Sequence, residues 1–233
     1  MTRRPLGSLL RSRGAVLVIT CAIVVAAGAV TGGAWLRRQP PPLPMYGLVP
    51  DFSLVERSGH IATRADLAGK VSIVDFFYTR CPDVCPLQSA HMARLQTELT
   101  GAPDARLVSI TVDPDHDRPA VLAAYAARFQ ADPTRWLFLT GPRDAVYRLA
   151  VDGFHLAAVV SGALRPTPWW PGLGPAQAWA HEEPAGSKVI QLVHASYFAL
   201  VDRQAHIRGY FEGTRWDDVQ RLQKDAKRLL AQR

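Results

Sequence analysis

Two cysteines, Cys81 and Cys85, are the residues whose type and spacing most clearly predict chemistry in this chain. Three residues separate them, whereas the usual thiol–disulfide motif has two intervening residues. A thiolate can exchange with a disulfide, and it can also hold a soft metal ion. The spacing alone therefore leaves open a redox-active pair, a two-sulfur metal clamp and a structural disulfide.

The segments on either side of the cysteines predict where the two thiols lie. A short apolar run, Val71 to Phe77, is β-branched and aromatic and too short for a helix, so we expect a buried strand. A helix is expected from Leu87 to Leu99, with Pro86 at its first position, where a missing N–H costs little. Both thiols then lie on a strand-to-helix turn, where the positive end of the helix favours thiolate.

The rest of the chain alternates short apolar runs with amphipathic ones, which predicts an α/β domain with a central mixed sheet flanked by helices. Three acids, Asp113, Asp115 and Asp117, follow one predicted strand. We expect Asp117 to cap the next helix and leave the role of Asp113 open. Further strands are expected at 51–55, 105–112, 136–139, 189–193, 197–201 and 206–211, and further helices at 120–129, 143–151 and 216–230.

One segment, residues 161–188, breaks this alternation. It contains five prolines and three tryptophans and has no clear periodicity. A loop of this length within a compact domain is usually functional or disordered. Its tryptophans, Trp169, Trp170 and Trp179, predict a docking patch or a loop folded back on the domain, with equal support for each.

The positive charge of the chain is concentrated at the amino end. The formal net charge is +7, but residues 1–38 hold six arginines and no acid. The remainder has 21 basic and 20 acidic residues and is therefore nearly neutral. This distribution argues against a nucleic-acid partner, because a phosphate-binding surface needs a basic patch on the folded domain.

The uncharged run that follows residue 14 predicts a membrane anchor. Residues 15–36 are rich in Ala, Val and Ile and long enough to cross a hydrocarbon layer of ~30 Å. Basic residues in 1–14 keep that end in the cytoplasm, so the domain at 51–233 would face the periplasm or the cell exterior, attached by a single pass to the inner membrane. Residues 37–50 contain five prolines and predict a stiff tether. The alternative is a cleaved signal peptide.

Three blocks of sequence resemble the Sco/SenC family. The first is Phe77 to Pro86, which reads FYTRCPDVCP, and the second is Val108 to Pro119, which reads VSITVDPDHDRP. The third is Val193 to Ser196, followed by the strand from Tyr197 to Asp202. The resemblance covers roughly residues 48 to 225. It implies a thioredoxin-like fold behind an amino-terminal transmembrane helix.

The resemblance also implies a copper site made of Cys81, Cys85 and His194. Thiolates suit Cu(I) and imidazole accepts either oxidation state, so this set can hold Cu(I) or Cu(II). The family serves copper insertion into cytochrome c oxidase, which implies a metallochaperone rather than an enzyme, with the copper-bearing oxidase subunit as partner. The family pattern has an acid before the histidine and a serine after it, where this chain has Val193 and Ala195.

Two other functions remain open. Cys81 and Cys85 could act as the redox pair of a thiol–disulfide oxidoreductase that reduces cysteines of the oxidase subunit or of another extracytoplasmic target. A second copper chaperone or a thioredoxin-like reductant would then be a further partner. A copper-dependent redox sensor is the third possibility. Five other histidines are expected to be ordinary: His60, His91, His116, His155 and His206. His181 lies beside two glutamates, which leaves a metal-binding role open, although an ordinary role is favoured.

Overall fold

The computed structural model describes residues 18, 20–26, 28, 41–160, 163–164, 191–193 and 196–232. Residues from Leu43 onward form one compact unit, and Met1–Pro42 form another. Within the described positions, no helix is both long and apolar enough to cross a bilayer. Much of the expected anchor at 15–36, all of 1–14, and most of the expected loop at 161–188 lie outside the described residues, so these predictions stay predictions.

The larger unit is built on a mixed sheet of eight strands in the order β1-β11-β10-β4-β5-β6-β2-β3. The pairs β4–β5 and β5–β6 are parallel, and the other neighbouring strands are antiparallel. This confirms the central mixed sheet. The strands are β1 (Gly47–Leu48), β2 (Ser53–Glu56), β3 (Ile61–Thr63), β4 (Val71–Phe77), β5 (Ala105–Thr111), β6 (Trp136–Thr140), β10 (Tyr197–Val201) and β11 (His206–Glu212).

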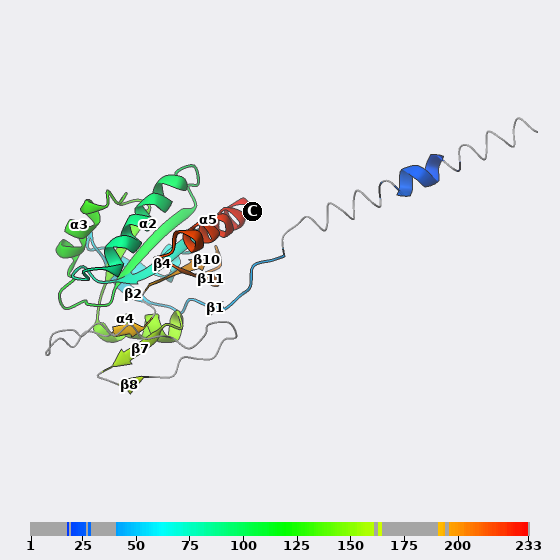
Figure 1. Ribbon diagram of the computed structural model, residues 1–233. Helices are drawn as coiled ribbons and strands as arrows, with labels where there is room; N and C mark the ends of the chain where they lie inside the picture. The colour runs from blue at the N-terminus through cyan, green and yellow to red at the C-terminus, as the bar shows by residue number, and fades with distance from the viewer. Residues whose placement is uncertain are drawn as a thin grey trace, which may run out of the picture. The chain divides into compact units, whose positions relative to one another are not determined.

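Helices cover both faces of this sheet (Figure 1). Helices α2, α3 and α5 pack on one face, and α4 with the π-helical turn η2 packs on the other. A separate small sheet has the order β8-β7-β9. The bounds are α2 (Val84–Glu98), α3 (Pro119–Arg128), α4 (Arg143–Arg148), α5 (Trp216–Ala231), η1 (Arg64–Asp66), η2 (Leu149–Gly153), β7 (Ala157–Val160), β8 (Ala163–Leu164) and β9 (Gln191–Val193).

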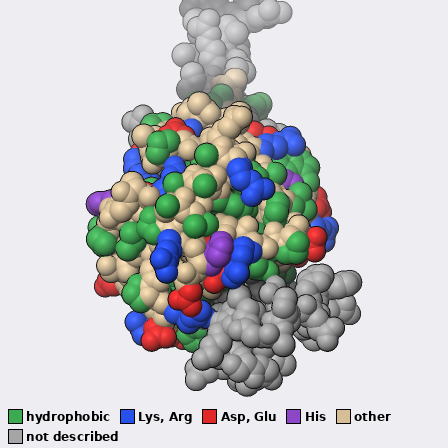
Figure 2. Space-filling view, turned by 90° about the vertical axis from the view of Figure 1, so that its left-hand side faces the viewer, with side chains coloured by type: hydrophobic (Ala, Val, Ile, Leu, Met, Phe, Trp, Pro, Cys, Tyr) green, Lys and Arg blue, Asp and Glu red, His purple; other side chains and the backbone are tan. Residues whose placement is uncertain are grey.

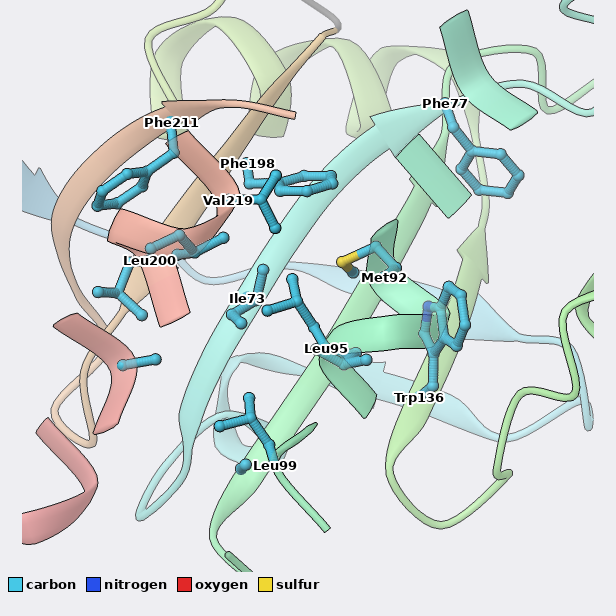
Figure 3. Close-up of a cluster of buried hydrophobic side chains, with 14 of the residues drawn as sticks. Ile73, Phe77, Met92, Leu95, Leu99, Trp136, Phe198, Leu200, Phe211 and Val219 are labelled. Carbon is cyan, nitrogen blue, oxygen red and sulfur yellow. The ribbon is translucent and has the colours of Figure 1, made fainter. Parts of the chain in front are cut away.

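Strand β4 is the centre of the core, and all seven of its residues are buried. Ile73 and Phe77 pack with Met92 and Leu95 of α2 on one face, as Figure 3 shows. Successive side chains of a strand point to opposite faces, so Val74 and Phe76 belong to the cluster on the α4 face. A strand covered on both faces reads as a mostly apolar run, which is why β4 was recognisable from the sequence despite Ser72 and Asp75.

Helix α2 begins earlier than the sequence predicts. It starts at Val84, so Cys85 lies inside its first turn and Pro86 is its third residue rather than its first. Proline is accepted there because the first four N–H groups of a helix have no intrahelical partner. The expected helix at 143–151 is also divided, because α4 ends at Arg148 and the chain continues as η2.

Asp75 places a carboxyl group in the middle of β4, on the face that packs against α2. It is 1% exposed. The hydroxyl of Ser109 donates to Asp75 Oδ1 at 2.6 Å, and the indole N–H of Trp136 donates to that hydroxyl oxygen at 2.9 Å. Among the described residues Asp75 Oδ2 has no hydrogen-bond partner. Burial raises the pKa of Asp75 to about 7, because the charged form loses its hydration.

We therefore expect Asp75 to make the stability of the domain depend on pH. The folded state binds its proton more tightly than the unfolded state, so the contribution is fully present near pH 4 and is lost as the pH rises through about 7. Asp75→Asn keeps an oxygen for Ser109 and removes the charge. The variant should gain roughly 4 kcal/mol in unfolding free energy relative to the parent between pH 4 and pH 8.

Urea unfolding of the reduced protein at several pH values measures this difference. Asp144→Asn is the control, since Asp144 is an exposed acid. If Asp75→Asn and the parent lose stability in parallel over this range, burial does not hold the proton on Asp75.

Candidate metal centre

Cys81 and Cys85 meet at the start of α2, and we call residues 81–85 the dithiol turn. Cys81 is half-buried, whereas Cys85 is only 2% exposed. The backbone N–H of Cys85 donates to Cys81 Sγ, with an N···S distance of 3.4 Å. Asp83 is exposed, as expected, and its side chain makes no cap hydrogen bond. The sulfur of Cys81 therefore accepts an N–H group that has no partner within the helix.

The two thiols differ in acidity. The hydrogen bond from the Cys85 thiol, together with backbone N–H groups of Cys85 and Asp83, lowers the pKa of Cys81 to about 5. The pKa of Cys85 is raised, first because its proton is held in that bond and second because the thiol is buried. The reduced pair thus holds one proton near neutral pH, on Cys85. This gives a nucleophilic sulfur at the surface with a second sulfur behind it.

A buried carboxylate, that of Asp117, fixes the chain just before the dithiol turn. Its oxygens accept hydrogen bonds from the backbone N–H of Thr79 at 3.0 Å and from the Thr79 hydroxyl at 2.5 Å. The hydroxyl of Thr111, at the end of β5, donates to the same carboxylate at 2.5 Å. Asp117 is fully buried. Asp117 therefore joins the carboxyl ends of β4 and β5. We call Thr79, Thr111 and Asp117 the Asp117 clamp.

The expectation that Asp117 caps α3 is wrong. The N-cap position of that helix is Arg118, and no side chain caps it. Asp113, whose role was left open, forms an ion pair with Arg80 at 2.6 Å. Sequence reasoning missed Thr79 and Thr111 as partners because their contact depends on the parallel pairing of two strands. The sequence offered one signal for this contact, which is a threonine at or just after the end of each predicted strand.

The loop between β5 and α3, which holds Asp113 and Asp117, also contains His116. His116 Nδ1 lies 3.0 Å from Asp117 Oδ1, and the side chain of His116 is 39% exposed. Asp113, His116 and Asp117 each place one potential ligand atom within 4.8 Å of the others. On the face in Figure 2, basic side chains are interspersed with acidic and apolar ones.

His194, the third expected ligand, lies outside the described residues. So do the three loop tryptophans and His181. The structure brings Cys81 and Cys85 together and does not test the histidine. The described chain resumes at Ser196, whose carbonyl accepts the N–H of Gly213 at 2.6 Å. Phe198 of β10 pairs antiparallel with Asp75 of β4, so the start of β10 lies toward the end of β4 that leads into the dithiol turn.

A family model described as SCO1/SenC matches residues 43–168. The SCO1 protein homolog of Bacillus subtilis is 28% identical over 181 residues, which cover 76% of this chain and 81% of that protein. The mitochondrial protein SCO2 homolog of Bos taurus is 30% identical over 162 residues, covering 63% of this chain and 57% of that protein. The chain therefore spans just over half the length of the bovine relative.

Solved structures share the fold. A SCO1/SenC family lipoprotein from Bacillus anthracis is 26% identical with a TM-score of 0.61, covering 82% of this chain and 98% of that chain. BsSco is described as a member of the Sco family of cytochrome c oxidase assembly proteins that has a disulfide switch. It is 25% identical with a TM-score of 0.62, and the match covers 84% of this chain and 100% of that chain. Copper-bound ScoI from Bradyrhizobium japonicum is 22% identical with a TM-score of 0.56, and the match covers 78% of this chain and 99% of that chain. At this identity it supports the fold alone.

The unequal acidity of the thiols predicts unequal alkylation. At pH 6 and with disulfides reduced, iodoacetamide should modify Cys81 at least about tenfold faster than Cys85, because Cys81 is a thiolate and the more exposed of the two. Cys85→Ala removes the donor thiol, so the pKa of Cys81 should rise and its alkylation at pH 6 should slow by about tenfold. Mass spectrometry of timed digests measures both rates.

Leu87→Ala is the matched control, since Leu87 is an exposed residue of the same helix. Its rate for Cys81 should equal that of the parent. Equal modification of Cys81 in the parent and in Cys85→Ala would contradict the hydrogen bond between the two thiols.

Proposed function

The chain belongs to the SCO1/SenC family, and from this premise we propose that it binds copper and delivers it to the dinuclear copper centre of cytochrome c oxidase during assembly. The observation that carries the proposal is the dithiol turn, where both cysteines lie at the start of α2 and the backbone N–H of Cys85 donates to Cys81 Sγ at 3.4 Å. A pair of soft donors on one fixed turn is the ligand type that Cu(I) prefers. The family includes copper-bound members of this fold.

Cys81, Cys85 and His194 are the ligands we propose for this cargo. Ser196 is described and lies two residues after His194, a span of at most about 7 Å of extended chain. Since β10 starts beside the end of β4, this short span supports His194 as the nitrogen ligand. Copper is the transported substrate here. The residues of the dithiol turn would bind it and release it by ligand exchange, which needs no catalytic base.

The low pKa of Cys81 supports a second candidate function, reduction of a disulfide in the target. The Cys81 thiolate would attack one sulfur of the target disulfide and release the other sulfur as a thiolate. Cys85 would then lose its proton to that thiolate and attack Cys81, which closes a Cys81–Cys85 disulfide and leaves a target dithiol. Two electrons pass to the target, so an external dithiol must reduce the pair again.

We further propose that the protein is held at the outer face of the inner membrane by residues 15–36. The uncharged run and the arginines on both sides of it support a single pass with the domain outside. The Bacillus anthracis relative is described as a lipoprotein, which is consistent with membrane attachment in the family.

Replacement of the proposed ligands separates the two functions. In the full chain, Cys81→Ser with Cys85→Ser should abolish the visible thiolate-to-Cu(II) absorption and the copper that survives dialysis. His194→Ala should weaken copper retention by at least about tenfold and leave disulfide reduction intact. Metal analysis after dialysis and a disulfide-reduction assay give the two readouts.

His60→Ala is the matched control, since His60 is an exposed histidine on the β2–β3 turn, and it should behave as the parent. Copper uptake that is unchanged in the double cysteine variant would sink the proposed site. Reduction without any copper retention would favour the oxidoreductase.

Membrane attachment has its own test. The full chain should stay in the membrane fraction after a carbonate wash, with its first residues intact. Val24→Asp with Val25→Asp should release it, because a charge at the centre of a span costs about 3 kcal/mol. Soluble parent protein with a new amino terminus near Ala29 would instead demonstrate a cleaved signal peptide.

A further inference from the structure

The imidazole of His116 is held in one orientation at the surface. Its Nδ1 lies 3.0 Å from Asp117 Oδ1. An ionised carboxylate only accepts hydrogen bonds, so Nδ1 carries the proton and the neutral ring has a bare lone pair on Nε2. Among the described residues, no hydrogen bond or ion pair engages that Nε2. With 39% of the side chain exposed, the ring is accessible to solvent.

Asp117 orients this ring and has no capacity left to bind a metal. Oδ1 accepts from the Thr79 hydroxyl and from His116, and Oδ2 accepts from the Thr79 N–H and the Thr111 hydroxyl. An ionised carboxylate has about four acceptor positions, and these four donors occupy them. A histidine whose other nitrogen donates to a fixed carboxylate is the arrangement usually found around metal-binding imidazoles.

The ring is linked through Asp117 to Thr79, two residues before the dithiol turn. Thr79 Oγ1 and His116 Nδ1 both bond to the same oxygen of Asp117. Cys81 follows Thr79 by two residues, a span of at most about 7 Å. The backbone on both sides is fixed, since His116 N–H donates to the carbonyl of Asp113 at 3.1 Å and the carbonyl of His116 accepts the N–H of Arg118 at 2.8 Å.

We propose that His116 is an auxiliary copper ligand, which binds Cu(II) through Nε2 and passes it to the dithiol turn. The transfer exchanges ligands and leaves the oxidation state of the ion unchanged while it is on His116. Imidazole nitrogen and water are suitable ligands for Cu(II). This inference rests on the proposed function, because it assigns an entry position to the same cargo.

Two of the arginines near the ring are paired with acids, whereas Arg118, two residues after His116, is exposed and has no ion pair among the described residues. Arg80, the basic residue next to Cys81, is paired with Asp113 at 2.6 Å. Arg143 is paired with Asp115, the exposed acid that precedes His116. Each of these arginines is therefore neutralised by a carboxylate of the same loop.

The first experiment asks whether the ligand exists, independently of the dithiol turn. Full chain carrying Cys81→Ser, Cys85→Ser and His194→Ala is labelled with ¹⁵N-histidine in detergent, and its ring signals are followed as Cu(II) is added below one equivalent. The His116 signal, identified by its loss in His116→Gln, should broaden before that of His60. Before metal is added, its nitrogen shifts should show a proton on Nδ1.

The second experiment asks whether the ligand serves transfer. With the native cysteines and His194 present, stopped-flow absorption follows the growth of the thiolate-to-Cu(II) band. His116→Gln should slow that growth by about tenfold and leave its final amplitude unchanged. Glutamine can still donate to Asp117, so the clamp is kept. His60→Gln, a matched exposed histidine beside Asp66, should match the parent in both respects.

The outcomes separate this inference from the proposed function. Absence of any thiolate–copper band in the parent refutes the proposed function. The first experiment still tests whether His116 binds Cu(II), because its variant lacks the two cysteines and His194. A His116 signal that persists while other histidines broaden overturns the inference. Broadening of His116 with unchanged uptake also overturns it, because His116 would then be an adventitious copper site only.

Discussion

The Asp117 clamp is the interaction on which the site depends. A fully buried carboxylate draws four donors to itself, and three of them come from the ends of two neighbouring parallel strands. A buried charge is tolerated only when it is fully hydrogen-bonded. Loss of any one of these hydrogen bonds would therefore destabilise the folded state. Because Thr79 is two residues before Cys81, the same bonds determine where the dithiol turn leaves the sheet.

The core then sets the direction of the helix that carries the second sulfur. Ile73 and Phe77 pack against Met92 and Leu95, and this holds α2 across the face of β4 (Figure 3). The unpaired N–H groups at the start of α2 consequently face Cys81, which takes up one of them. The low pKa of Cys81 then comes first from the hydrogen bond of the Cys85 thiol and next from the backbone N–H groups of Cys85 and Asp83.

The fold was largely predictable from the sequence, because burial on both faces makes β4 and β5 mostly apolar and rich in β-branched residues. The start of α2 was not, since proline is accepted at several positions of the first turn and Pro86 alone does not specify which. The two cysteines were found from their motif. The role of Asp117 depends on two threonines distant in sequence, and a local reading assigned it to a nearby helix. The place of His194 stays a prediction.

The unequal burial of the two cysteines gives metal exchange a direction. Cys85 lies in the first turn of α2 and is 2% exposed, whereas Cys81 precedes the helix and is half-buried. If copper binds at the dithiol turn as we propose, a ligand arriving from solvent meets Cys81 before Cys85. We therefore infer that Cys81 exchanges first and that Cys85 keeps the ion until the last step of its release.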